Sequence, residues 1–114
     1  GQFIARTLAK HGRIVVTSRS DYTEIANGMG VTYIPLADPD AFLAQDLDVV
    51  IVATSILSFE STIVKLLPSL EAYVDGKGRG PLIVDVLSVK EHARDIMLQH
   101  LPEECDILCT HPMF

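Results

Sequence analysis

Short apolar runs alternate with amphipathic stretches along the whole chain. The apolar runs are Arg13–Thr17, Val31–Ile34, Asp48–Ala53, Leu82–Leu87 and Ile107–Cys109. Short runs rich in β-branched residues and bounded by turn signals are typical of buried parallel strands. Alternation of such strands with helices produces a parallel sheet covered by helices on both faces. The pattern therefore predicts an α/β fold of the Rossmann type, with a doubly wound parallel sheet.

The stretches between these runs carry apolar residues at helical spacing. Helices are predicted over Gly1–His11, Tyr22–Met29, Phe59–Leu67 and Val89–Leu101, with one or two helical turns over Pro39–Leu43. Pro68 is expected to interrupt the helix that precedes it, leaving Ser69–Val74 as a loose extension. The glycine-rich stretch Asp75–Pro81 is expected to form an exposed turn.

Small polar residues follow the last two predicted strands. Ser88 comes after Leu82–Leu87, and Thr110 and His111 come after Ile107–Cys109. The carboxyl ends of parallel strands meet at one edge of a sheet, which is where α/β folds bind ligands. Of the four histidines only His111 lies at a strand tip, and imidazole exchanges protons near neutral pH. We therefore predict that His111 and Ser88 are catalytic; an ordinary surface histidine is the alternative.

The segment Ser18-Arg19-Ser20 follows the strand that would be second in a complete Rossmann sheet. An acidic residue there binds the ribose of NAD, whereas an arginine accommodates the 2′-phosphate of NADP. Two hydroxyls and a guanidinium suit a phosphate dianion, so the sequence predicts NADP. Asp21 is the candidate acid of an NAD site, but it is expected at the N-cap of the next helix. The alternative for Arg19 is a solvated turn residue.

Two further positions are predicted to contact the cofactor. Gly1, followed by a helix and a strand, is what remains of a G-x-G-x-x-G loop cut at its last glycine; a capping glycine is the alternative. Thr54 and Ser55 end the strand Asp48–Ala53, where the chain passes beneath the pyrophosphate and nicotinamide ribose. They are equally suited to cap the next helix near Ser58.

On this interpretation residues 1–114 form a partial NADP-binding Rossmann domain that lacks its first strand and the start of its glycine-rich loop. The usual strand order is 3-2-1-4-5-6, so the sheet is expected to have a gap at its centre. We expect such a domain to be unstable or inactive by itself.

Composition narrows the choice of partner. The 114 residues leave room for one domain, and the formal net charge of −6 gives no general attraction to nucleic acid or to an anionic membrane. No apolar run approaches the roughly 20 residues that span a bilayer. A soluble protein with a small-molecule substrate is therefore expected.

Other reactive side chains are predicted to have structural roles or none. Cys105 and Cys109 lack the spacing of a metal site, so we expect no metal and idle thiols. Asp85 lies within an apolar run and needs a partner to be buried. Lys90 is interpreted as a surface residue, with a positioning role as the alternative.

The chain resembles the arogenate/prephenate dehydrogenase family, especially the arogenate dehydrogenases of plants. The resemblance is carried by SRSDY at Ser18–Tyr22, ATSILS at Ala53–Ser58, VDVLSVKE at Val84–Glu91 and DILCTHPMF at Asp106–Phe114. It implies oxidative decarboxylation of L-arogenate, or of the related prephenate, with NADP as hydride acceptor in tyrosine biosynthesis.

The resemblance also implies roles for the predicted residues. His111 would bind the ring hydroxyl of the substrate and take its proton, while Ser88 would help to hold both. Ser18, Arg19 and Ser20 would contact the 2′-phosphate, and Gly1 would be the final glycine of the phosphate loop. In the family a helical domain follows the His-Pro motif, supplying the substrate-carboxylate contacts and the homodimer interface. The implied compartment is the plastid stroma, with the cytoplasm as alternative.

Two other functions remain open from the sequence. The first is another Rossmann dehydrogenase that acts on a hydroxy or imino acid. The second is a non-catalytic nucleotide-sensing module, in which replacement of His111 would change nothing.

Overall fold

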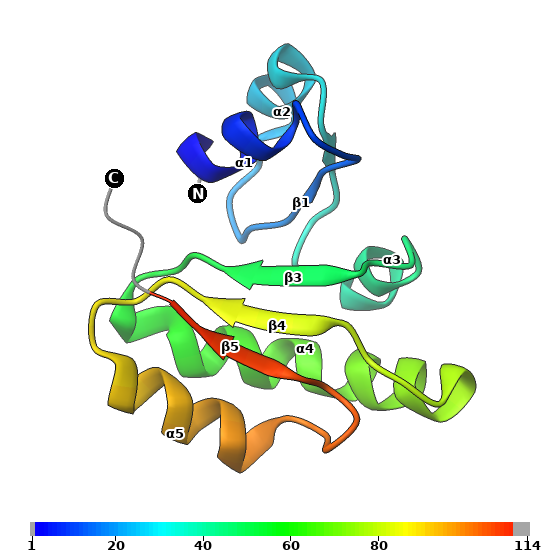
Figure 1. The fold of residues 1–114 in the computed structure, drawn as a ribbon. Coiled ribbons are helices and arrows are strands. Elements are labelled where there is room, and N and C mark those ends of the chain that lie inside the picture. Colours follow the sequence, from blue (N-terminus) through cyan, green and yellow to red (C-terminus); the bar gives the residue numbers. More distant parts are fainter. Residues whose placement is uncertain (1, 111–114) are drawn as a thin grey trace. The chain divides into compact units, whose positions relative to one another are not determined.

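The computed structural model describes the backbone of residues 2–110 and the side chains of residues 4–110, in two compact units, 1–45 and 46–114. The elements are α1 (Gln2–Leu8), β1 (Val15–Val16), α2 (Thr23–Met29), β2 (Thr32–Tyr33), α3 (Pro39–Leu43), β3 (Val49–Val52), α4 (Ile56–Lys77), β4 (Leu82–Asp85), α5 (Lys90–His100) and β5 (Ile107–Cys109) (Figure 1). The alternation of helices and parallel strands confirms the predicted α/β class. No helix among residues 2–110 is long and apolar enough to cross a membrane.

The first unit contains a two-stranded parallel sheet. β1 pairs with β2 so that Val16 lies opposite Tyr33, and the amide of Ile34 continues the pairing with a 2.9 Å hydrogen bond to Val16 O. α2 connects the strands and ends at Gly30, whose φ of 74° lies in the left-handed region that glycine adopts without strain. The register places the ends of β1 and β2 next to each other, and Ser18 and Tyr33 with them.

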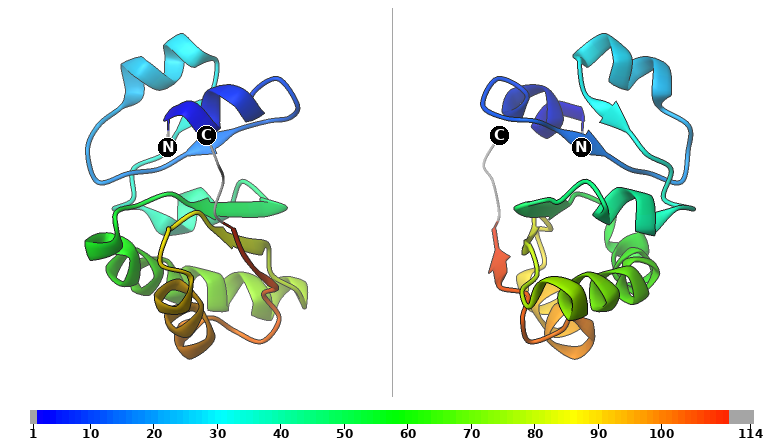
Figure 2. Two further views of the ribbon diagram at one scale, coloured as in Figure 1. Left: turned by 60° about the vertical axis from the view of Figure 1, so that its left-hand side comes forward. Right: turned by 90° about the vertical axis from the view of Figure 1, so that its right-hand side faces the viewer.

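The second unit contains a three-stranded parallel sheet in the order β3-β4-β5. α4 and α5 lie side by side on one face of it (Figures 1 and 2). The core between helices and sheet consists of fully buried apolar side chains from three elements, namely Phe59, Ile63, Leu70, Ile83 and Met97. Burial of each such side chain contributes about 1.5–3 kcal/mol, so this packing holds the strand ends in place.

The neighbour relations in both sheets are those of the order 3-2-1-4-5-6. In that order β1 and β2 are the second and third strands, and β3, β4 and β5 are the fourth, fifth and sixth. Among the described residues no strand joins β1 to β3, which is the position that the order gives to its first strand.

The predicted interruption of α4 at Pro68 is wrong. The helix runs unbroken from Ile56 to Lys77, so part of the predicted turn Asp75–Pro81 is also helical. Proline removes one amide donor, to the carbonyl of Val64, but both residues are exposed and water can satisfy that carbonyl. The buried side chains on either side of the proline maintain the packing of the helix. The turn begins only at Gly78, which ends the helix with a φ of 76°.

Candidate functional site

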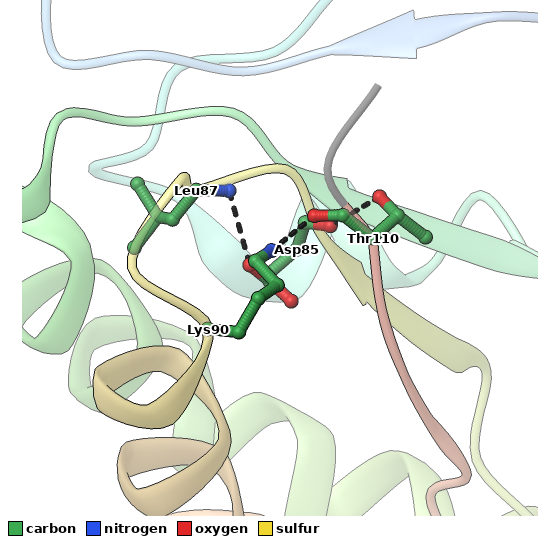
Figure 3. A network of polar contacts seen from close by, with 4 residues as sticks. All are labelled: Asp85, Leu87, Lys90 and Thr110. Atoms are coloured by element: carbon green, nitrogen blue, oxygen red, sulfur yellow. Dashed lines mark hydrogen bonds and ion pairs between the residues drawn. The ribbon is translucent and has the colours of Figure 1, made fainter. Parts of the chain in front are cut away.

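Asp85 ends β4 and has no exposed surface. Burial of an ionised carboxylate is unfavourable unless it is paired and hydrogen-bonded. Its Oδ2 atom accepts a 3.0 Å hydrogen bond from the amide of Leu87 and forms an ion pair with Nζ of Lys90 (Figure 3). The predicted requirement for a partner is therefore confirmed. Oδ1 is also buried and has no hydrogen-bond partner among the described residues.

Lys90, the first residue of α5, links the ends of two strands. Besides Asp85, its ammonium donates to the backbone oxygen of Thr110, directly after β5. Thr110 is bound in turn to the carbonyl of Asp85, through its hydroxyl at 2.6 Å and its amide at 3.1 Å. Lys90 keeps 32% of its side chain exposed, but its contacts with Asp85 and Thr110 favour the positioning role over the interpretation as an ordinary surface residue.

These contacts bring the ends of β4 and β5 together, as the pattern of polar strand tips predicts. Ser88 is exposed in the turn between β4 and α5, two residues before Lys90. Thr110 is partly exposed at the end of β5. His111, the predicted catalytic partner of Ser88, and Gly1, the predicted phosphate-loop glycine, lie outside the described residues. Their roles stay predictions.

Both cysteine thiols, Cys105 and Cys109, have a raised pKa. Burial, then the neighbouring Asp85 carboxylate, raises the pKa of the Cys109 thiol, and burial, then Glu104 and Asp106, raises that of Cys105. Both are therefore protonated near neutral pH, whereas a reactive cysteine needs a lowered pKa. Within the described residues no cluster of His, Cys, Asp and Glu could hold a metal ion.

The end of β1 forms a tight polar turn at Ser18, Arg19 and Ser20. Ser18 Oγ donates a 2.6 Å hydrogen bond to Ser20 O, and the hydroxyl of Tyr33 lies 3.0 Å from Ser18 O and 2.6 Å from Ser20 O. Arg19 and Ser20 are exposed. A guanidinium and a hydroxyl accessible on one turn fit a phosphate dianion, so the local chemistry suits the predicted 2′-phosphate.

Tyr33 is a residue that sequence reasoning missed. No motif marks it, because its relation to Ser18 depends on the register between β1 and β2. The usable signal is the pairing of the two predicted strands: a parallel register with Val16 opposite Tyr33 brings a phenol to the end of β1.

Asp21 is directed at the start of α2. Its Oδ1 atom accepts hydrogen bonds from Oγ1 and the amide of Thr23, at 2.5 and 2.9 Å, and these bonds lower the pKa of the carboxyl. The N-cap residue of α2 is Tyr22, so the predicted N-cap position of Asp21 is wrong by one residue: Asp21 lies directly before the cap. Because one of its oxygens is engaged by the helix, Asp21 is a poorer candidate for the acid of an NAD site.

Thr54 and Ser55 follow β3 as expected. Ser55 is the N-cap residue of α4 by position, but its hydroxyl donates to Ser58 Oγ at 3.3 Å and makes no side-chain cap to the backbone. Thr54 Oγ1 donates to Ser55 O at 3.2 Å. Contact of either residue with a cofactor remains a prediction.

Comparison with known proteins gives one family and several relatives. The family described as "Prephenate dehydrogenase, nucleotide-binding domain" matches residues 4–114. "Arogenate dehydrogenase 1, chloroplastic" and "Arogenate dehydrogenase 2, chloroplastic" of Arabidopsis thaliana are 48% and 44% identical to the chain over 115 residues. "Probable arogenate/prephenate dehydrogenase" of Methanocaldococcus jannaschii is 28% identical over 114 residues. Each match covers 100% of this chain, which spans only 17%, 30% and 24% of the respective relatives.

Proposed function

Since the chain belongs to the family of prephenate dehydrogenase nucleotide-binding domains, we propose that it is the NADP-binding Rossmann domain of an arogenate or prephenate dehydrogenase in tyrosine biosynthesis. The observation that carries the proposal is the family match over residues 4–114. The names of the two Arabidopsis relatives favour arogenate as substrate.

The proposed cofactor is NADP, which supplies the hydride acceptor when bound. Arg19 and Ser20 are exposed and carry donors suited to the 2′-phosphate, with Ser18 in the same turn. The engagement of Asp21 with α2 supports NADP over NAD. Gly1, Thr54 and Ser55 complete the proposed cofactor contacts, along the pyrophosphate and the nicotinamide ribose.

His111 is the proposed base, with Ser88 as its partner in binding the ring hydroxyl of the substrate. His111 takes the hydroxyl proton as hydride leaves the same carbon, which becomes a carbonyl. The ring then loses its carboxylate as CO₂: the electron pair of the broken C–C bond moves into the ring, which becomes aromatic, and the carbonyl becomes a phenolate that takes the proton back from His111. Thr110 supports this arrangement, because its carbonyl group forms the peptide bond to His111 and is held by Lys90.

The relatives are longer than this chain, so we also propose how cofactor binding, substrate binding and dimerisation are divided between domains of the full-length protein. Residues 1–114 would form the cofactor domain. A helical domain would supply the contacts to the substrate carboxylate and the interface of a homodimer. The chloroplastic relatives support the plastid stroma as compartment.

The experiment is an assay of the full-length protein with arogenate, prephenate and simple hydroxy acids, each with NADP and with NAD. Formation of tyrosine and reduced NADP from arogenate is the expected result. Turnover of hydroxy acids alone would show a different Rossmann dehydrogenase. Nucleotide binding without turnover of any substrate would favour the sensing module.

A further inference from the structure

The hydroxyl of Tyr33 binds two backbone carbonyls of the turn at the end of β1. It lies 2.6 Å from Ser20 O and 3.0 Å from Ser18 O, so its single proton is shared between two carbonyls. Ser20 O accepts a second hydrogen bond, from Ser18 Oγ, and Ser18 O accepts one from the amide of Leu36 at 3.1 Å. Both carbonyls are thereby fixed in direction, and the proton of Ser18 is used inside the turn.

The direction of these carbonyls determines that of two amides. In a trans peptide the N–H of each residue points opposite to the carbonyl of the residue before it, and no described peptide bond is cis. Since Ser18 O and Ser20 O point toward Tyr33, the amides of Arg19 and Asp21 point away from it. The turn therefore has a carbonyl side, which faces Tyr33, and an amide side.

These two sides differ in how they interact with an anion. Carbonyl oxygens repel a phosphate, whereas backbone amides that converge in a turn attract it. We propose that Tyr33 is a positioning residue for cofactor choice. Its hydroxyl keeps the carbonyls of Ser18 and Ser20 directed away from the cofactor, so that the amide side of the turn and Arg19 face the 2′-phosphate of NADP. This inference rests on the proposed function and adds a specificity residue on β2.

The test is replacement of Tyr33 by phenylalanine in the full-length protein. Tyr33→Phe removes only the hydroxyl, and loss of one such hydrogen-bonding group should weaken NADP binding about three- to tenfold. Binding of NAD, which lacks the 2′-phosphate, should change less than about twofold. Dissociation constants are measured by titration calorimetry, and thermal unfolding establishes that the variant is folded. Tyr22→Phe is the matched control, because Tyr22 is an exposed tyrosine in the same unit.

A second variant separates the hydrogen bonds from the packing of the ring. Replacement of Tyr33 by 4-aminophenylalanine keeps a donor at the same position and should restore the preference for NADP. The inference is overturned if Tyr33→Phe leaves the affinity for NADP unchanged, or weakens NADP and NAD equally. If Arg19→Ala then still lowers NADP affinity, the proposed cofactor site stands without Tyr33. If the wild-type protein does not prefer NADP, the proposed cofactor and this inference both fail.

Discussion

The carboxylate of Asp85, which has no exposed surface, is paired with the ammonium of Lys90 across the turn from β4 to α5. The same ammonium binds the backbone of Thr110. One lysine thus compensates a buried charge and joins the ends of two strands that carry the proposed catalytic residues. Its loss should affect both stability and the geometry of the site.

Lys90→Met should lower the free energy of unfolding by about 3 kcal/mol, because it leaves a buried carboxylate without its counter-charge. Urea unfolding of the full-length protein measures the difference. The matched control is Arg94→Met, which breaks an exposed pair with Asp95 at 3.6 Å and should change stability by less than about 1 kcal/mol. An equally small effect of Lys90→Met would show that Lys90 does not stabilise the buried carboxylate of Asp85.

Arg19→Ala should weaken NADP binding by roughly 10- to 100-fold, since a charge-assisted hydrogen bond to phosphate contributes about 1.5–3 kcal/mol. NAD binding should be nearly unchanged. The control is Arg79→Ala, which removes another exposed arginine side chain, from the turn after α4. Equal losses of affinity for NADP and NAD, measured by titration, would show that Arg19 does not recognise the 2′-phosphate.

Gly80→Ala should destabilise the protein by about 1–3 kcal/mol, because the added Cβ would lie 2.4 Å from Cys105 Sγ and 3.2 Å from Val74 Cγ2. Adding Cys105→Ala should recover part of the loss, as the sulfur is then absent. Gly76→Ala is the control: no atom lies within 4 Å of the new methyl group, and its helical position should give a gain of about 0.5–1 kcal/mol. Equal effects at both glycines in chemical denaturation would be inconsistent with the packing described.

The raised pKa values of Cys105 and Cys109 predict slow thiol modification near neutral pH. Both thiols should react with a disulfide reagent faster in urea than in buffer, and Cys105, which is 5% exposed, should be the slower one. Because burial raises the pKa of both thiols above the ordinary value of a cysteine, their contribution to stability is complete below that ordinary pKa. It is lost as the pH rises through the folded values. Rapid labelling of native Cys105 at neutral pH would contradict the burial and the raised pKa of its thiol.

Local patterns predicted the parts of the fold that local residues control. The β-branched run before Thr54 gave β3, and the polar residues after β4 and β5 identified neighbouring strand tips. Partners that depend on strand register or on a turn between elements were not predictable in this way, as Tyr33 with Ser18 and Lys90 with Asp85 illustrate. Pro68 was misjudged because a helix tolerates proline where the freed carbonyl meets solvent and the opposite face is packed.

The proposed catalytic role of His111 is tested most directly by comparing tyrosine formation from arogenate and NADP by the full-length wild-type protein and by His111→Asn. The wild type should form tyrosine, CO₂ and reduced NADP in equal amounts. Loss of a general base should lower kcat by about 10²- to 10⁴-fold while the dissociation constant for NADP stays the same. Absence of tyrosine with the wild-type protein, or an unchanged rate with His111→Asn, would contradict the proposed function.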